Sequence, residues 1–290
     1  MKAAPFVFVR ATALSDVFAA FERHGDDARI VAGGQSLMPM MNMRLAAPRV
    51  LVDINHIAEL NGVSETDGTL RIGALTRHQE LGVNALVAEH APLLTMASTH
   101  IAHPAIRNRG TFGGSLSHAD PAAELPACAI ASDAVINAVS SSRGERSIKA
   151  VDFFLGTFHT ALEPDEILVS VDIPIIGAAE RVAFDELARR QGDYALVGLA
   201  AKGTIEGKTF KDLRLVFFSV ADRPILATET IATLEGKDYS PDTVTVAEAA
   251  LEVDLQDIDS DLHTSAATKT HLARVLVGRV LAELAGEGRQ

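Results

Sequence analysis

Two stretches decide the fold: VAGGQSLMP at residues 31–39 and IRNRGTFGGSLSHADP at residues 106–121. In the first, an apolar run leads into Gly33 and Gly34, and the polar pair Gln35 and Ser36 follows. Glycine accepts positive φ and lets backbone N–H groups approach a ligand, and successive N–H groups in such a turn form a concave anion site. A diphosphate suits this loop, but so does a plain tight turn from a strand into a helix.

The second stretch carries Gly110, Gly113 and Gly114 among several small hydroxyl side chains. A loop so rich in backbone donors has no obvious use in a core, and two such loops suit a diphosphate gripped from both sides. Neither loop matches G-x-G-x-x-G or G-x-x-x-x-G-K-[ST], so the dinucleotide fingerprint and the P-loop lose their main support.

Composition excludes several classes of function. The chain has 290 residues, 48% of them hydrophobic, and a formal net charge of −12, which argues against nonspecific nucleic-acid binding. Its single cysteine, Cys128, cannot hold an iron–sulfur cluster or a structural zinc, and its apolar neighbours indicate a buried, inert thiol. We expect no signal peptide, no membrane span and a cytoplasmic protein.

Alternating strand and helix patterns predict an α+β fold. An antiparallel sheet followed by helices is expected in the C-terminal part, and a domain boundary is expected at residues 177–179, after the apolar run ILVSVDI that Pro174 closes. Thr76 with Gln79 has the form of a capping box for a helix that ends near Leu81. The expected strands are 28–32, 49–54, 134–139, 145–148, 167–173, 182–187, 197–205 and 213–220, with a hairpin at 62–76. The expected helices are 92–99, 122–132, 227–234, 244–251 and 265–285.

With the segments EPDEILVSVDIP (residues 163–174) and ARRQGDYALVG (residues 188–198), the two loops resemble the FAD-binding medium subunits of the molybdenum hydroxylases, a family that includes subunits of xanthine dehydrogenase, carbon monoxide dehydrogenase and quinoline oxidoreductase. The resemblance covers essentially the whole chain. It implies a two-subdomain FAD-binding domain of the PCMH type at residues 1–177, divided into about 1–56 and 57–177. A C-terminal flavoprotein domain would occupy residues 178–290.

The resemblance also implies a set of cofactor contacts. It places the diphosphate loops at residues 32–36 and 111–114, the ribityl contact on Glu124 or Asp120, and a residue covering one flavin face at Tyr194. Apolar contacts near the flavin would come from Ile30, Ile101 and Leu168. The full set of expected cofactor-binding residues is Ile30, Ala32, Gly33, Gly34, Gln35, Ser36, Leu37, Ile101, Thr111, Gly113, Gly114, Ser115, His118, Asp120, Glu124, Leu168 and Tyr194.

Two positions depart from the family pattern, and a third bears on how the flavin is held. Asp185 stands where xanthine dehydrogenase carries a lysine near the flavin, and a negative charge there would disfavour an anionic reduced flavin. Ser115 replaces a more usual asparagine. Gln35 occupies the position at which related flavoproteins with covalent flavin often have a histidine, so the resemblance implies noncovalent FAD.

Other polar residues carry weaker hypotheses. His100, His103 and His118 lie close together in sequence, but no carboxylate stands at metal-ligand spacing, so we expect no metal site. Arg107 and Arg109 suit either a phosphate or a partner subunit. The methionines at 38, 40, 41 and 43 indicate packing, beside a surface that another subunit covers. No catalytic side-chain constellation stands out, so the chemistry is expected to belong to the flavin.

The function implied is an electron-transfer subunit. Substrate would react at a molybdenum cofactor in a large subunit, and electrons would pass through iron–sulfur clusters in a small subunit to this FAD and then to an external acceptor. The substrate implied is an N-heteroaromatic compound, with carbon monoxide or aldehydes as further options. Two alternatives remain open: an autonomous flavin-dependent oxidase or dehydrogenase, and a noncatalytic nucleotide-binding module.

Overall fold

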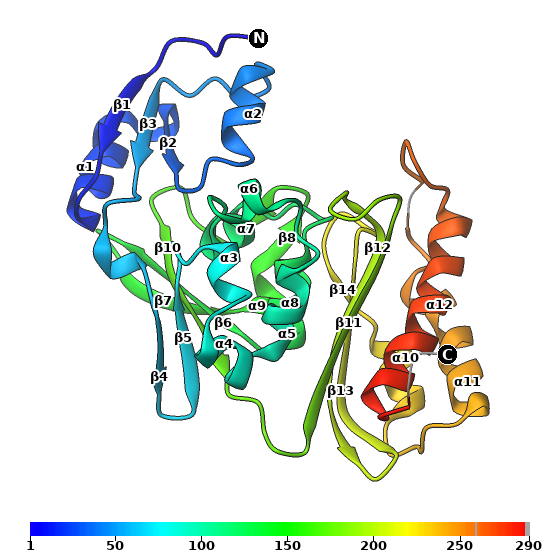
Figure 1. The fold of residues 1–290 in the computed structure, drawn as a ribbon. Coiled ribbons are helices and arrows are strands. Elements are labelled where there is room, and N and C mark those ends of the chain that lie inside the picture. The colour runs from blue at the N-terminus through cyan, green and yellow to red at the C-terminus, as the bar shows by residue number, and fades with distance from the viewer. Residues whose placement is uncertain (259, 288–290) are drawn as a thin grey trace.

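The computed structural model describes residues 1–258 and 260–287. Its elements form consecutive layers (Figure 1). A small N-terminal subdomain lies at one end, above a sheet. A layer of short helices separates this sheet from a second one, and three C-terminal helices cover the outer face of that second sheet (Figure 1). The α+β class expected from the sequence is confirmed.

The N-terminal subdomain is built on a parallel three-stranded sheet in the order β1-β3-β2. Val50 of β3 pairs with Val7 on one side and with Ala28 on the other. A core of small and branched side chains, including Val17 and Val52, fills the space between this sheet and helix α1. Its elements are β1 (Val7–Arg10), α1 (Leu14–His24), η1 (Gly25–Asp27), β2 (Ala28–Val31), α2 (Leu37–Asn42), β3 (Val50–Asp53) and η2 (Ala58–Leu60).

The second subdomain contains an antiparallel five-stranded sheet in the order β4-β5-β10-β6-β7. Short helices pack on one face of this sheet and enclose a core with Phe112 and Phe153 fully buried. Its strands are β4 (Val63–Thr66), β5 (Thr69–Gly73), β6 (Val135–Ser140), β7 (Gly144–Lys149), β8 (Phe154–Gly156), β9 (His159–Thr160) and β10 (Ile167–Pro174). Its helices are α3 (His78–Leu81), α4 (Ala85–His90), α5 (Pro92–Ser98), α6 (Pro104–Arg107), α7 (Phe112–His118), α8 (Glu124–Ala131) and α9 (Ala150–Phe153).

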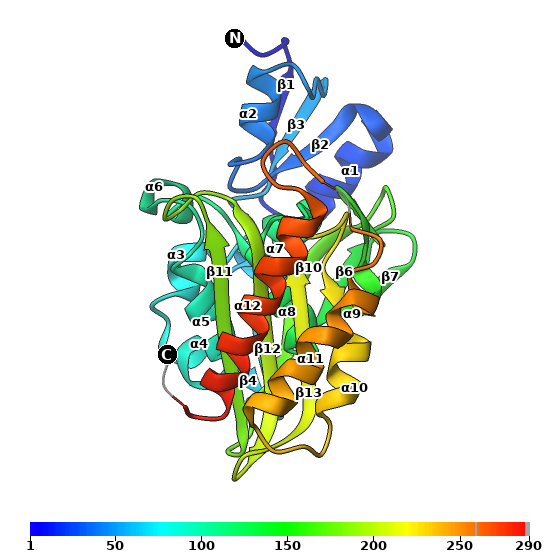
Figure 2. The ribbon, with the colours of Figure 1, turned by 90° about the vertical axis from the view of Figure 1, so that its right-hand side faces the viewer.

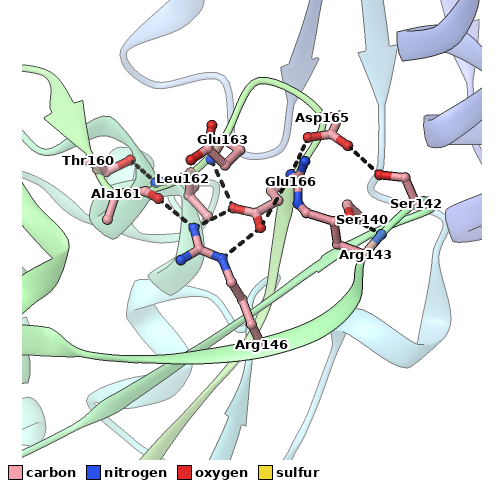
Figure 3. A network of polar contacts seen from close by, with 10 residues as sticks. All are labelled: Ser140, Ser142, Arg143, Arg146, Thr160, Ala161, Leu162, Glu163, Asp165 and Glu166. Carbon is pink, nitrogen blue, oxygen red and sulfur yellow. Dashed lines mark hydrogen bonds and ion pairs between the residues drawn. The ribbon is translucent and has the colours of Figure 1, made fainter.

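An ion-pair network fixes the entrance to the long central strand β10 (Figure 3). The carboxylate of Glu166, with 1% of its side chain exposed, accepts two hydrogen bonds from Arg146 on β7, at 2.7 and 2.8 Å. It also accepts the backbone N–H of Glu163 at 2.8 Å, while Arg143 reaches Asp165 at 2.5 Å. The network ties the β6–β7 hairpin to the loop before β10.

The C-terminal unit is an antiparallel sheet in the order β11-β12-β13-β14 with three helices on one face (Figure 2). Along β11 the side chains alternate: Ala183 joins the core under the helices, whereas Phe184 joins the core shared with the second subdomain. Phe184 stacks on Phe218 of β13, with ring centroids 5.8 Å apart. Its elements are β11 (Glu180–Ala188), β12 (Ala195–Glu206), β13 (Thr209–Phe218), β14 (Ile225–Leu226), α10 (Thr228–Leu234), α11 (Pro241–Asp254) and α12 (Ala266–Leu284).

The expected strands and long helices are present, with ends that differ by a few residues. The capping box at Thr76 is wrong: helix α3 begins at His78 with Arg77 as its N-cap, and the Thr76 hydroxyl donates to the carbonyl of Gly62. The stretch at 106–121 is also not one loop, because it contains helix α7. Within the described part of the chain, no helix combines the length and apolar character that crossing a bilayer requires.

Candidate functional site

The two glycine-bearing stretches meet backbone to backbone. A Cβ atom placed on Gly33 would lie 2.3 Å from the carbonyl oxygen of Arg109 and 2.8 Å from the Cα of Gly110. Any side chain at position 33 would therefore force the stretches apart. Gly34 has a φ of 71°, which glycine adopts at no steric cost. Residues that lie more than 70 apart in sequence thus form one continuous edge.

A polar network not anticipated from the sequence holds the two stretches together. The Asn55 side-chain amide donates to the Ala32 carbonyl at 2.8 Å and to Asp53 Oδ1 at 2.6 Å. Asn55 Oδ1 accepts from Arg77 at 2.7 Å, and the same guanidinium donates to the Arg109 carbonyl at 2.5 Å. Asp53 ends strand β3, so the pattern Asp-x-Asn directly after a buried strand was the available signal.

A neutral histidine lies under the second stretch. His78 Nε2 contacts the Thr111 carbonyl at 2.9 Å, and its backbone N–H donates to the Gly110 carbonyl at 3.0 Å. Burial lowers the pKa of His78 to about 4, and the charges of Arg77 and Arg107 act in the same direction. Near neutral pH the ring is uncharged, so Nε2 carries the proton and donates to Thr111.

The first loop keeps its backbone donors available. Within the described residues, the N–H groups of Gly33, Gly34, Gln35 and Ser36 donate to no backbone or side-chain acceptor of the chain. The Gln35 side chain folds back and donates to the Gly33 carbonyl at 2.8 Å. The Ser36 hydroxyl makes no capping bond to helix α2. This loop has the donor set that a diphosphate requires.

The second stretch differs from the prediction. The N–H groups of Phe112 and Gly113 donate to the Thr76 and Ala74 carbonyls at 2.9 and 2.8 Å, and that of Gly114 is capped by Thr111 Oγ1 at 3.2 Å. The idea that this stretch offers free amides at 112–114 is therefore wrong.

Its glycines serve close packing instead. A Cβ on Gly113 would lie 2.6 Å from that of Ala74, and one on Gly110 would lie 2.8 Å from the His78 ring. Gly113 lets helix α7 approach Ala74, which directly follows strand β5. Gly110 lets the turn before helix α7 approach His78 at the start of helix α3. The half-buried Ser115 hydroxyl donates to no acceptor in the described part of the chain, so it is free to meet a ligand.

A group of acidic side chains lies beyond helix α7. Asp120 accepts the Ala122 N–H at 2.9 Å, and its charge acts on the phenol of Tyr194, whose residue surface is 66% exposed. Partial desolvation, and then the Asp120 charge, raise the pKa of Tyr194 to about 12. Burial, and then the charges of Glu186 and Asp120, raise the pKa of Glu124 to about 8. The predicted residues Asp120, Glu124 and Tyr194 are thus neighbours.

The turn before Tyr194 docks against the second subdomain. Gly192, at a φ of 77°, would place a Cβ 2.8 Å from the Ala102 carbonyl oxygen and 3.0 Å from the His103 ring. The Ser219 N–H of the C-terminal sheet donates to the Pro121 carbonyl at 2.8 Å. The C-terminal unit therefore contributes directly to the surface around helix α7.

The expected apolar contacts are divided between two cores. Ile101 and Leu168 belong to the core of the second subdomain, with 7% and 3% of their surface exposed. Ile30 is half-buried and packs on the core of the N-terminal subdomain. Leu37 opens helix α2 directly after the first loop. The structure brings Ile101 and Leu168 into one cluster and leaves Ile30 in the other.

The structure corrects the expectation for Asp185. Its carboxylate faces helix α12, where it lies 3.5 Å from Arg279, and it accepts the N–H of Glu186. Strand alternation explains this, because Phe184 and Glu186 occupy the opposite face, toward the second subdomain. Glu186 is a charged residue of β11 on that side, and it contacts His100.

The histidines and arginines serve separate contacts. His100 pairs with Glu186 at 3.3 Å, and His118 stacks on Phe158 with ring centroids 4.7 Å apart. Arg107 donates to the Ile101 and Ala102 carbonyls at 2.9 and 3.0 Å, so it shapes its own loop. Arg109 is exposed. Among the described residues, no group of three metal-ligating side chains converges.

The residues present fit a dinucleotide with a diphosphate. Unpaired amides of one loop meet a second backbone at a distance that only glycine permits. The Ser115 hydroxyl lies on helix α7, and the acidic side chains follow after the end of that helix. Ser36 and Ser115 provide donors for phosphate oxygens, whereas Asp120 and Glu124 suit the hydroxyl groups of a polyol. These groups are suited to binding and orienting a cofactor.

Two family models match the chain. "FAD binding domain in molybdopterin dehydrogenase" matches residues 4–176, and "CO dehydrogenase flavoprotein C-terminal domain" matches residues 182–284. Together they span both halves of the fold.

Characterised relatives match over nearly the full length. The chain is 38% identical over 285 residues to the 6-hydroxypseudooxynicotine dehydrogenase complex subunit alpha of Paenarthrobacter nicotinovorans, covering 98% of this chain and 95% of that protein. It is 36% identical over 257 residues to the carbon monoxide dehydrogenase medium chain of Hydrogenophaga pseudoflava, covering 89% of each.

Solved structures show the same fold. The carbon monoxide dehydrogenase of Hydrogenophaga pseudoflava gives a TM-score of 0.94 at 35% identity, covering 99% of both chains. Quinoline 2-oxidoreductase from Pseudomonas putida 86 gives a TM-score of 0.92 at 38% identity, again covering 99% of both.

Proposed function

We propose a role for this chain that starts from its family: the chain belongs to the FAD-binding medium subunits of the molybdenum hydroxylases. In this role it holds FAD noncovalently and carries electrons between iron–sulfur clusters of a small partner subunit and an external acceptor. Bound flavin supplies the redox chemistry, since it accepts electrons one or two at a time. The residues of this chain bind it, orient it and set its electrostatic surroundings.

The observation that carries the proposal is the contact of Gly33 with the Arg109 backbone beside four unpaired amides. In the proposed complex, the N–H groups of Gly33–Ser36 donate to the diphosphate, and the Ser36 and Ser115 hydroxyls add further donors. The hydrogen bonds of Arg77 and Asn55 hold the backbones of the two stretches next to each other. Gln35 offers no imidazole for a covalent bond to flavin, which supports noncovalent binding.

The acidic side of the site would hold the sugar-alcohol chain and the ring. Asp120 and Glu124 would accept hydrogen bonds from ribityl hydroxyls, and the exposed ring of Tyr194 would cover one flavin face. The buried side chains of Ile101 and Leu168 support this region from below. Asp185 takes no part, because its carboxylate faces helix α12.

Partner subunits are part of the proposal. The one cysteine, Cys128, is fully buried on helix α8, so the chain cannot ligate an iron–sulfur cluster. A large molybdenum-binding subunit and a small iron–sulfur subunit would supply the missing centres. Phe8, Met43 and Leu45 of the N-terminal subdomain are 52%, 59% and 69% exposed, which suits a surface that another subunit covers.

The substrate of the complex would be an N-heteroaromatic compound. Relatives named nicotine 6-hydroxylase medium subunit and caffeine dehydrogenase subunit beta, at 36% and 34% identity, support this class. We also place the functional boundary at residues 177–178, in the connection between β10 and β11. The external acceptor and the cytoplasmic location expected from the sequence stay part of this proposal.

Purification of the tagged chain from its native host tests this function. We expect a complex with a molybdenum-containing large subunit and an iron–sulfur subunit, and one FAD per copy of this chain that acid precipitation releases. A chain that purifies in folded form without flavin and without partners would overturn the proposal. Flavin that stays attached to the precipitated protein would contradict only the noncovalent mode of binding, and the rest of the proposal would stand.

A further inference from the structure

Strand β1 lies at the edge of the N-terminal sheet and leaves one side of its backbone open (Figure 1). It pairs in parallel with β3, and no other strand of the described chain pairs with it. The Val7 N–H donates to the Arg49 carbonyl at 2.8 Å, on the β3 side. Because alternate residues of a paired strand bond to opposite sides, the N–H and C=O groups of Phe8 and Arg10 point to the open side. The edge therefore presents the donors and acceptors that a further strand would pair with.

The side chains along this edge are apolar and exposed. Phe8 is the register partner of Leu51 on β3, yet Leu51 is 1% exposed and Phe8 is 52% exposed. Phe6 and Val7, at 38% and 60%, extend the apolar surface toward the N-terminus. A strand paired with β1 would cover the outer side of Phe8. Apolar side chains and an open backbone edge together favour a partner in extended conformation.

The turn between α2 and β3 continues the same surface. Met43 and Leu45, 59% and 69% exposed, flank Arg44, whose guanidinium donates to the Lys2 carbonyl at 3.4 Å. This contact places the turn beside the segment that leads into β1. The opposite edge of the sheet, strand β2, is described in full and has no exposed large apolar side chain. The apolar surface of this subdomain therefore belongs to the β1 side.

Positive charge surrounds this edge in a chain that is acidic overall. Residues 1–56 contain six basic and five acidic residues, whereas the whole chain has a net charge of −12. Four of the six basic residues lie on β1 or beside it through backbone contacts: Lys2, Arg10, Arg44 and Arg49. Arg49 makes one loose ion pair, at 3.8 Å, and among the described residues no carboxylate pairs with the other three. An acidic partner is favoured, whereas a second copy would bring an equally basic edge to this one.

We infer that the open edge of β1 receives an extended strand of a partner subunit, which presents apolar side chains to Phe8 and carboxylates to Lys2 and Arg10. Main-chain hydrogen bonds along β1 give this contact its affinity, and the alternating side chains give it its specificity. The assignment of the strand to a subunit of the same redox complex rests on the proposed function. The pairing itself follows from the edge.

Hydrogen–deuterium exchange resolved to single amides tests the strand pairing on the unmodified protein. In the full chain purified alone, the amides of Phe8 and Arg10 should exchange faster than those of Val7 and Val9, which face β3. In the complex, exchange at Phe8 and Arg10 should slow at least about tenfold, while the amides of β2 change less than about twofold. A complex in which Phe8 and Arg10 exchange as in the chain alone overturns the inference and leaves the proposed function intact.

Variants of the edge test the side-chain contacts. Phe8→Lys and Arg10→Glu should each lower the amount of molybdenum-containing and iron–sulfur subunits that purify with the tagged chain at least about tenfold. The matched controls are Val246→Lys, at a side chain 53% exposed on α11, and Arg29→Glu, on the opposite edge strand β2. Both controls should leave this amount unchanged, and so would Phe8→Lys and Arg10→Glu if the inference is wrong. If a variant melts early, the exchange measurement decides.

The oligomeric state of the chain purified alone separates the partner strand from a second copy. Sedimentation should show a monomer. A dimer that Phe8→Lys dissociates would assign the edge to a second copy and overturn the partner strand. A folded chain that recruits no partner subunit in its host overturns the proposed function as well, so the two failures are distinguished by whether a complex forms.

Discussion

Replacing Gly33 by alanine tests how closely the two loops must approach. The new Cβ would lie 2.3 Å from the Arg109 carbonyl oxygen, and ordinary contact begins near 3.4 Å, so the backbones must separate by about 1 Å. The neighbouring atoms belong to the backbone and cannot rotate away. Overpacking of this kind costs about 1–3 kcal/mol. Without ligand, the loops part and relieve the clash, but a diphosphate that contacts both must restore it.

The FAD dissociation constant should therefore rise by about 5- to 150-fold, because each 1.4 kcal/mol corresponds to about tenfold. Quenching of flavin fluorescence on adding FAD to flavin-depleted protein measures this change. Gly177→Ala is the matched control: its Cβ would meet only the flexible Glu180 side chain, at 3.4 Å, and its φ is not positive. Circular dichroism and thermal melts establish that both variants fold.

Affinity of Gly33→Ala within twofold of the unmodified protein, with the fold intact, would refute the reasoning. Loss of affinity in the Gly177→Ala control would refute it as well, since the effect would then not be specific to the loop contact.

Three further perturbations have outcomes set by the structure. The pKa of His78 is about 4 in the folded state against about 6.5 unfolded, so the folded state binds fewer protons between these values. The free energy of unfolding should therefore fall by up to about 3 kcal/mol as pH drops from 6.5 to 4. In urea unfolding, His78→Gln should make the free energy of unfolding depend less on pH over this range. An unchanged pH dependence in the variant would contradict the prediction. Tyr194→Ala should weaken FAD binding about 2- to 10-fold through loss of ring stacking, whereas Tyr194→Phe should not; equal effects would exclude stacking. Glu166→Gln should lower the free energy of unfolding by about 2 kcal/mol, because it removes the negative charge that pairs with Arg146. A change below about 0.5 kcal/mol would show that the ion pair in Figure 3 contributes little.

The sequence predicted the fold class and the long elements because their apolar periodicity is local. The run ILVSVDI forms β10 at the centre of its sheet, and the final helix spans Ala266–Leu284 as its apolar spacing indicated. The prediction from sequence did not include β1, α1 and several short helices. Strand β1 carries the burial pattern of a solvated edge, and helices such as α6 are four residues long, which leaves too little pattern to detect.

The candidate site was predicted in part. The close backbone approach at the first loop was predictable because Gly33 and Gly34 mark a backbone requirement that is visible in the chain itself. The second stretch was misread because the partners of its amides, Ala74 and Thr76, lie more than 30 residues away. Asn55 and Arg77 were missed for the same reason, since their role depends on which backbones the fold brings together. The side chain of Asp185 faces helix α12 because successive side chains of β11 point to opposite faces of the sheet. Which layer packs on each face is not specified by any single stretch of sequence.

The central claim is that the two loops close on the diphosphate of a dinucleotide, and comparison of two flavins tests it most directly. FMN carries the same ring and ribityl chain as FAD but lacks the diphosphate bridge and the adenosine. Dissociation constants for both are measured on flavin-depleted protein in its native complex, with ADP as competitor. The account predicts that FAD binds at least about tenfold more tightly than FMN and that ADP competes with FAD. Equal affinity for FAD and FMN, with no competition by ADP, would contradict it.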